Sequence, residues 1–167
     1  GTTMIKKNAD DPLVSVVTPV HNGEPYLAEC IESVLAQSYG NFEYLIINNC
    51  STDGSLETAQ SYARGDKRIR VLENLQLLNQ IKNHNQALRS ISPNSVYCKV
   101  HAAHDRLLPT CLQAMVSLAE SDEKIGAVGA YTLLDWGNHS SVYLTGLPYR
   151  QKVFSGKDVC RRFLLDG

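Results

Sequence analysis

The sequence has no excess of either charge and few signs of a secreted or membrane-bound chain. Sixteen basic and seventeen acidic residues leave a formal net charge of -1, which gives no electrostatic reason to expect nucleic acid as a partner. The five cysteines are odd in number and never form C-x-x-C, which disfavours a disulfide framework or a zinc knuckle. No apolar run approaches a membrane span of ~18 residues, and none opens the chain as a signal peptide would. We therefore expect a reducing, cytoplasmic setting.

Two nucleotide-binding motifs are also missing from the sequence. Neither G-x-G-x-x-G nor G-x-x-x-x-G-K-[ST] occurs, which argues against a dinucleotide-dependent oxidoreductase and a P-loop phosphotransferase. The length of 167 residues and the hydrophobic content of 43% fit one domain with a substantial core. Residues 1–3, ahead of Met4, are interpreted as a cloning scar, and residues 1–11 as this scar and an N-terminal tail.

What the sequence does contain is a regular alternation of strand and helix patterns. Residues 14–22 and 44–55 each begin as a β-branched apolar run, end in small and polar residues, and precede a helix start. This pattern predicts an α/β fold with an open parallel sheet. The first helix is predicted from Glu24 and Pro25, with apolar side chains at helical spacing. Further strands are predicted at 69–72, 96–100 and 125–131. Further helices are predicted at 56–63, at 79–91 and from Pro109. A hairpin or excursion should follow, and then a last helix from Ser155 to Leu165 with a capping-box-like start.

Polar residues follow the first two predicted strands at the point where each strand ends. Because neighbouring parallel strands end at the same edge of a sheet, residues 18–22 and 48–53 should converge and line a pocket for a polar ligand. Asp53 and Gly54 could bind phosphate through N–H groups at a helix start. On this segment alone, a simple helix cap by Ser51 or Asp53 is the favoured interpretation.

Histidines supply the other candidate site residues. His104 and Asp105, at the end of the fourth predicted strand, could hold a divalent cation, or Asp105 could be a turn residue. His21, His84 and His101 could each contact a ligand or be half-buried structural residues. The cysteines are interpreted as small hydrophobic residues, and no Ser-His-Asp or Cys-His arrangement has a local signature.

Five segments together resemble one protein family. They are residues 18–27, 33–39, 42–55, 85–88 and 102–109, and their order and spacing are similar to those of the family 2 glycosyltransferases over residues 12 to about 131. The resemblance implies the GT-A fold, a Rossmann-like sheet with helices on both faces. It also implies a nucleotide-diphosphate sugar donor, a Mg or Mn ion, and inversion at the anomeric carbon.

The resemblance also assigns donor-binding residues. Pro19, His21 and Glu24 match the tip of the family's first strand, which contacts the nucleoside and ribose. Asn49 stands where many members have an Asp against the uracil edge, and an amide offers both a donor and an acceptor there. Asn85 matches an asparagine common on the following helix. The candidate donor-binding residues are thus Pro19, His21, Glu24, Asn49, Asp53, His84, Asn85 and His104.

The largest departure from the family lies in the acidic motif. Residues 102–105, Ala-Ala-His-Asp, replace the family's D-x-D-D. Asp105 keeps the position of the usual metal-binding carboxylate, whereas Ala102 and His104 replace acids. Asp105 and His104 are therefore the predicted metal ligands for Mn or Mg, with poor metal affinity expected in the absence of donor.

The resemblance implies an inverting glycosyltransferase that moves sugar to a glycan or lipid-linked acceptor in cell-surface polysaccharide synthesis. We expect a donor-binding core at 12–131, the start of an acceptor-side region at 132–167, and a general base beyond Gly167, so that the 167 residues alone are inactive. The setting would be cytoplasmic or the inner face of the membrane, with peripheral association through missing regions. An apolar seam near Tyr143, Leu147 and Phe154 is compatible with self-association.

Two other interpretations stay open. The altered acidic motif and the absent base fit a sugar-nucleotide-binding module without transferase activity. A flavodoxin-like signalling domain would need an acid cluster at the end of the first strand, where this chain has Thr-Pro-Val-His-Asn at 18–22.

Overall fold

The computed structural model describes residues 11–135, 137–143 and 153–159, except for the side chain of Tyr143. By its internal contacts the chain divides into two compact units, residues 1–113 and 114–167. The units are described separately below. The predicted donor-side and acceptor-side boundaries stay predictions.

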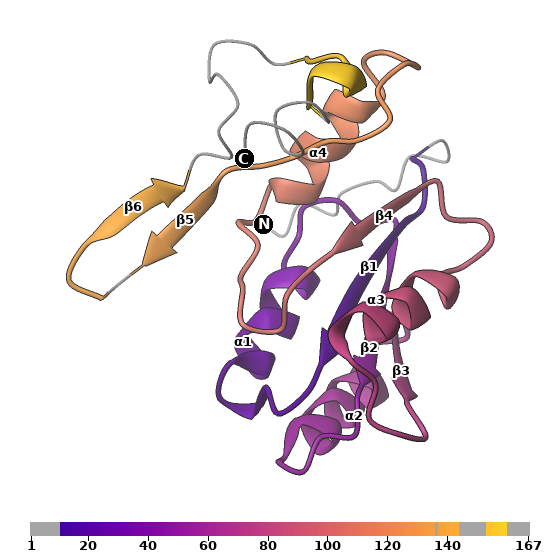
Figure 1. The fold of residues 1–167 in the computed structure, drawn as a ribbon, viewed down its shortest axis with the longest axis vertical. Coiled ribbons are helices and arrows are strands. Elements are labelled where there is room, and N and C mark those ends of the chain that lie inside the picture. Colours follow the sequence, from indigo (N-terminus) through magenta and orange to yellow (C-terminus); the bar gives the residue numbers. More distant parts are fainter. Residues whose placement is uncertain (1–10, 136, 144–152, 160–167) are drawn as a thin grey trace, which may run out of the picture. The chain divides into compact units, whose positions relative to one another are not determined.

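The first unit is built on a parallel sheet of four strands within the described residues. The strands are β1 (Val14–Val20), β2 (Phe42–Asn48), β3 (Ile69–Glu73) and β4 (Tyr97–Val100), in the order β3-β2-β1-β4 (Figure 1). All three neighbouring pairs are parallel. β1 and β2 are buried along almost their whole length, as expected for strands with both faces covered. The predicted α/β class is confirmed.

Helices connect consecutive strands. They are α1 (Glu24–Leu35), α2 (Ser55–Gly65) and α3 (Gln80–Arg89), and α4 (Cys111–Ala119) follows β4. Right-handed crossovers place α1 and α2 on one face of the sheet and α3 on the other (Figure 1). The apolar stripe predicted for α1 is buried at Leu27, Cys30, Ile31 and Val34. None of the helices in the described part of the chain has both the length and the hydropathy to cross a membrane.

The core beneath α3 joins three elements. Val17 of β1, Leu45 and Ile47 of β2 and Ala87 of α3 form one buried cluster. Leu72 and Ile91 pack against it and are partly buried. Burying a Val, Leu or Ile side chain contributes roughly 1.5–3 kcal/mol, so this cluster fixes α3 on the sheet.

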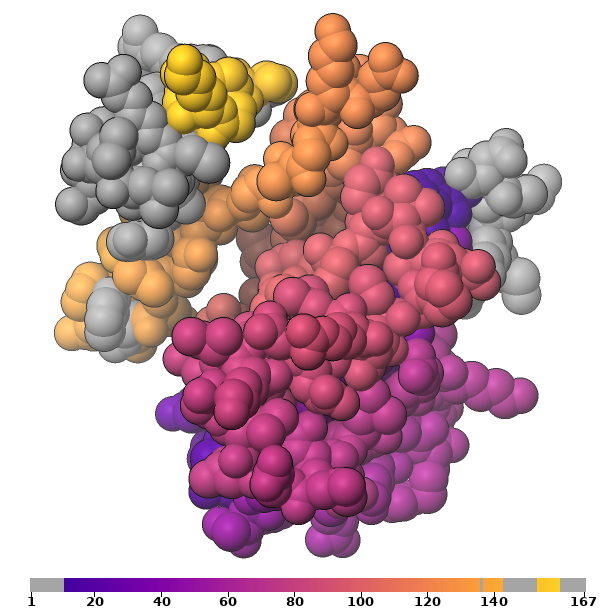
Figure 2. Space-filling model, turned by 45° about the vertical axis from the view of Figure 1, so that its right-hand side comes forward, coloured from indigo at the N-terminus to yellow at the C-terminus, as the bar shows by residue number. Residues whose placement is uncertain are grey.

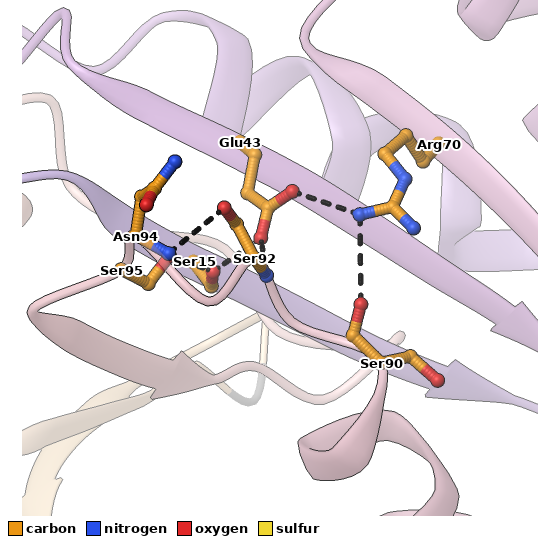
Figure 3. Close-up of polar contacts among 7 residues, drawn as sticks. All are labelled: Ser15, Glu43, Arg70, Ser90, Ser92, Asn94 and Ser95. Carbon is orange, nitrogen blue, oxygen red and sulfur yellow. Dashed lines mark hydrogen bonds and ion pairs between the residues drawn. The ribbon is translucent and has the colours of Figure 1, made fainter.

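A polar network lies at the N-terminal ends of the strands (Figure 3). The carboxylate of Glu43 accepts hydrogen bonds from Ser15 Oγ (2.5 Å), the Ser92 backbone N–H (2.6 Å) and Arg70 Nη1 (3.1 Å). Ser15 Oγ also contacts Ser95 Oγ. Burial alone would raise the pKa of Glu43, but these donors outweigh it and hold the pKa below its ordinary value. We call Glu43, Ser15, Arg70 and Ser92 the Glu43 network; it ties the loop before β4 to β1, β2 and β3.

The second unit contains a hairpin. β5 (Thr132–Asp135) and β6 (Ser140–Tyr143) pair in antiparallel fashion, and Gly137 has φ 80° in the turn between them. The backbone N–H of Gly137 donates to Asp135 Oδ1 at 2.9 Å. The predicted hairpin is confirmed.

The predicted last helix begins where its capping pattern placed it. Ser155 Oγ donates to Asp158 Oδ2 at 2.6 Å and accepts from the Asp158 N–H at 3.1 Å, and residues 156–159 are helical. The predicted end at Leu165 lies outside the described residues. Leu147 and the side chain of Tyr143 also lie outside the described residues, and Phe154 is half-buried. The apolar seam predicted near these three residues therefore stays a prediction.

The predicted buried strand at residues 125–131 is wrong. Residues 125–131 form no strand and are mostly exposed. Gly126 and Gly129 leave this short run with few side chains to bury, and a strand also needs a pairing partner. Among the cysteines, which are interpreted as small hydrophobic residues, Cys30 is buried and Cys98 is exposed.

Candidate functional site

The candidate site lies where the strand order reverses. β1 is flanked by β2 on one side and β4 on the other, and ligands of open α/β sheets bind outside the carboxyl ends of strands at such a point. Gly23, just after β1, shows how close the tips of β1 and β4 are. A Cβ at Gly23 would lie 2.8 Å from Val20 Cγ2 and 3.5 Å from Ala103 Cβ, so a larger residue there would press on its neighbours.

Hydrogen bonds join the tips of β1 and β2. His21 Nδ1 donates to the Asn49 carbonyl at 2.9 Å, because a carbonyl can only accept. Asn22 N donates to Ser51 Oγ at 3.0 Å, and Thr52 N donates to Asn22 Oδ1 at 2.8 Å. The predicted convergence of the two strand tips is confirmed. His21 is exposed, and in its neutral form its Nε2 is an acceptor available to a ligand.

Each tip turns through a residue in the left-handed region. Asn22 has φ 52° and Cys50 has φ 55°. This conformation costs about 1–2 kcal/mol for residues other than glycine, with Asn more tolerant. Cys50 Sγ donates to the Asn74 carbonyl at 3.3 Å. Strained backbone of this kind is concentrated at functional sites in proteins. Here it changes the direction of the two segments that follow β1 and β2 at the sheet edge.

Glu24 and Asp53 hold each other's helix starts. The Glu24 N–H donates to Asp53 Oδ2 at 3.1 Å, and the Gly54 N–H donates to Glu24 Oε2 at 2.9 Å. Asp53 Oδ1 also accepts from the N–H and hydroxyl of Ser55, at 3.0 and 2.6 Å. We call the two reciprocal bonds, from the Glu24 N–H to Asp53 and from the Gly54 N–H to Glu24, the Glu24–Asp53 clasp. A Cβ at Gly54 would lie 2.5 Å from Glu24 Oε1, so the glycine leaves room for the carboxylate.

The clasp favours the capping interpretation of Asp53 over phosphate binding at this helix start. Two of the backbone N–H groups at this helix start, those of Gly54 and Ser55, already donate to carboxylates. The hydrogen bond from Ser55, followed by those from backbone N–H groups, holds the pKa of Asp53 below its ordinary value. Both carboxylates are therefore occupied by the protein, and the contacts of Glu24 and Asp53 with a donor stay predictions.

Asn49 is buried at the tip of β2 and its amide is almost fully used. Its Nδ2 donates to the Leu78 carbonyl at 2.8 Å, and its Oδ1 accepts from Leu78 N and Asn74 Nδ2, both at 2.9 Å. Asn74 Nδ2 also donates to Asn83 Oδ1 at 2.8 Å. We call Asn49, Asn74 and Asn83 the amide chain. One N–H of the Asn49 side chain remains for a ligand, so a contact with a base would use that donor.

The predicted residues of α3 are half-buried or exposed, and their contacts with a donor stay predictions. His84 Nδ1 donates to the Gln80 carbonyl of its own helix at 2.8 Å, and Asn85 is exposed. The buried polar residue of this helix is Asn83, with 5% of its surface exposed. The structure thus brings Asn83 to the strand tips, and sequence reasoning missed it. The sequence signal for Asn83 was a helix rich in amides. Packing alone determines which of these amides is buried.

The predicted metal ligands lie on the loop after β4. The side chains of His104 and Asp105 are 73% and 52% exposed, with His104 Nε2 3.8 Å from Asp105 Oδ1. Across the residues that the structure describes, no three His, Cys, Asp or Glu side chains gather as a metal site. The pair offers two ligands, whereas Mg prefers six oxygens. It fits an ion that takes its other ligands from a bound diphosphate and water, not a preformed centre.

Buried groups support this loop from below. His101 is 3% exposed, and its Nε2 has no hydrogen-bond partner within the described ranges. Burial, then the nearby Lys99, lowers the pKa of His101 to about 4, so the ring is neutral at neutral pH. Cys30 Sγ donates to the Ala102 carbonyl at 3.5 Å, and burial raises the pKa of this thiol. The burial of His101 favours the structural interpretation over contact with a ligand.

Comparison with known proteins agrees with the fold. The model of the glycosyl transferase family 2 matches residues 15–159. An uncharacterized glycosyltransferase of Haemophilus influenzae is 31% identical over 157 residues, which cover 92% of this chain and 48% of that protein. The putative teichuronic acid biosynthesis glycosyltransferase TuaG of Bacillus subtilis is 44% identical over 61 residues, 36% of this chain and 24% of TuaG.

Solved structures share the fold. Residues 1–349 of TarS from S. aureus, in complex with UDP-GlcNAc, match with a TM-score of 0.60 and 22% identity, over 65% of this chain and 31% of that one. The α/β unit is thus of the GT-A class. The chain belongs to glycosyl transferase family 2. It spans about half the length of the H. influenzae relative.

Proposed function

We propose that the chain is the donor-binding part of an inverting glycosyltransferase that uses a nucleotide-diphosphate sugar. The observation that carries the proposal is the convergence of polar strand tips at the reversal of strand order in a chain of this family. That edge presents His21 beside the loop with His104 and Asp105, on a sheet whose tips are already held by their own hydrogen bonds. A site held in advance loses less entropy on binding.

Each residue has a distinct part in this proposal. Pro19 and His21 line the nucleoside side, and the free N–H of Asn49 meets a base acceptor. Asp105 and His104 face the diphosphate. A divalent ion held there with diphosphate oxygens would neutralise the charge that develops on the leaving group. The Glu24–Asp53 clasp keeps the β1 and β2 tips in register, which favours attack from the opposite face of the sugar by orienting the donor.

The acceptor side is proposed more broadly. We propose a glycan or lipid-linked acceptor in cell-surface polysaccharide synthesis, at the inner face of the membrane, in line with the name of the relative TuaG. We propose that the general base, which typically contributes 10²–10⁴-fold in rate, lies beyond Gly167. We therefore propose that the 167 residues bind donor without transferring sugar.

Titration calorimetry tests donor binding directly. UDP, GDP, CDP and dTDP are titrated with and without Mn, beginning with UDP because the TarS structure contains UDP-GlcNAc. We expect binding that tightens with Mn, and a loss of the Mn effect in Asp105→Asn. An Asp122→Asn variant, with an exposed carboxylate beyond α4, is the matched control. Failure of all four nucleotides to bind the folded chain would refute the proposal.

A binding module without transferase activity is the second candidate. Ala102 and His104, where family members carry acids, favour it, because fewer carboxylates weaken the hold on a hard cation. Incubating a longer natural form and the 167 residues with radiolabelled sugar nucleotide and lipid-linked acceptors separates the two. Donor binding without transfer by the longer form would select the module.

A further inference from the structure

The connection between β3 and α3 is held by amides instead of apolar burial. Leu75 and Leu77 are 103% and 62% exposed, so these side chains contribute little to holding residues 74–78. The loop instead offers both backbone groups of Leu78 to the side chain of Asn49, through the bonds described above. A loop with little apolar packing depends on such bonds for its position.

The three amides of the chain are matched as donors and acceptors. Asn74 uses one N–H on Asn49 Oδ1 and the other on Asn83 Oδ1. Asn49 and Asn83 are 5% exposed each, and a buried amide left without a partner costs about 1–3 kcal/mol. Asn74, itself bonded to α3, therefore orients the Asn49 side chain together with the two bonds to Leu78.

Asn49 links the loop to the candidate site. The backbone carbonyl of Asn49 accepts a hydrogen bond from His21 at the β1 tip, while the Asn49 side chain bonds the Leu78 backbone. The loop of residues 74–78 and His21 thus share one residue as their anchor. The magenta segment of α3 and the preceding loop forms part of the molecular surface in Figure 2, where it is accessible to a ligand.

We propose that Asn74 and Asn83 are positioning residues, which act through Asn49 to fix residues 74–78 as a wall of the donor site. This proposal rests on the proposed function. It assigns the roles to two asparagines outside the predicted set. Neither touches reacting atoms; they determine where the Leu78 backbone and the remaining Asn49 N–H stand when a nucleotide arrives.

Isosteric substitutions separate this role from simple packing. Asn74→Asp keeps the shape but replaces both donated bonds by contacts between acceptor oxygens. Asn83→Ala removes the acceptor, whereas Asn83→Asp retains it. Gln86→Ala, at an exposed position of α3, is the matched control because it touches none of the three amides.

Two measurements follow on each variant. Hydrogen exchange of the Leu78 amide, which donates to Asn49 Oδ1, reports the loop, and the Kd for UDP with Mn reports the site. Asn74→Asp and Asn83→Ala should speed the hydrogen exchange of the Leu78 amide. They should also raise the Kd for UDP about tenfold, a ratio that corresponds to ~1.4 kcal/mol. Asn83→Asp, which keeps the acceptor, should change both less than Asn83→Ala, and Gln86→Ala should leave both unchanged. Urea unfolding identifies any variant that loses global stability.

The outcomes are separable. Unchanged Leu78 exchange in Asn74→Asp would overturn the amide chain as the anchor of the loop. Faster exchange with an unchanged Kd would overturn the positioning role. If the wild-type chain binds none of the four nucleotides, the proposed function fails before any variant is made, and the positioning role fails with it.

Discussion

The two ends of the parallel strands use polar residues in opposite ways. At the N-terminal ends, the single carboxylate of Glu43 collects donors from β1, β3 and the loop before β4. At the C-terminal ends, Glu24 and Asp53 bind backbone N–H groups of neighbouring loops, while His104 and Asp105 stay exposed. The first arrangement satisfies its own members and supports the fold. The second holds loops in place and leaves two exposed polar side chains where we propose that the ligand binds.

The largest effect should come from breaking the N-terminal end. Glu43→Ala leaves Ser15, Arg70 and the Ser92 N–H without their shared acceptor, and we expect a loss of about 2 kcal/mol in the free energy of unfolding. Urea denaturation measures it. Glu73→Ala, which removes an exposed carboxylate from β3, is the control. Equal unfolding midpoints for the two variants would show that the Glu43 network does not stabilise the fold.

A smaller effect is expected at the clasp. Gly54→Ala should push Glu24 away from the Gly54 N–H and cost about 1 kcal/mol, the worth of one hydrogen bond. In a Glu24→Ala background the same change should cost little, which a double-mutant cycle detects. Gly65→Ala is the control, because a Cβ there meets nothing within 4 Å. Additive effects of Gly54→Ala and Glu24→Ala would show that the clasp does not act as a unit.

The smallest effect concerns pH and again separates the two ends. Burial opposes ionisation of Glu43, but its donors lower the pKa below the ordinary 4.5. The unfolded chain therefore binds this proton first, and the stabilising contribution of Glu43 is lost as pH falls below about 4.5. The stability difference between wild type and Glu43→Gln should be full at pH 7 and shrink on acidification, as followed by urea unfolding at several pH values. A difference independent of pH would contradict it.

Much of the fold could be predicted because the signal is local. β1 and β2 are continuous buried runs, and α1 carries its apolar residues at helical spacing, so each pattern reports its own structure. Residues 125–131 show the limit. The run is apolar, but whether it becomes a buried strand depends on a partner and on side chains that Gly126 and Gly129 lack.

The site could be located but not assembled from the sequence. The position of Asn49 at a strand end follows from the run before it. Its partner Asn74, and Asn83 to which Asn74 also donates, lie 25 and 34 positions away, and nothing local marks them as members of this network. The sequence likewise shows that Asp53 precedes a helix, but not that both carboxylate oxygens are occupied by N–H and hydroxyl donors from two helix starts.

The strand order also bears on how the chain folds. Val14 of β1 pairs with Phe42 of β2, 28 positions along, and with Tyr97 of β4, 83 positions along. Closing the longer loop costs about 1 kcal/mol more in chain entropy, so β4 should join last. The tips of β1 and β2 would then exist before the loop with His104 and Asp105 is in place. Pulse-labelling exchange should show protection of β4 amides after those of β2, and simultaneous protection would contradict this order.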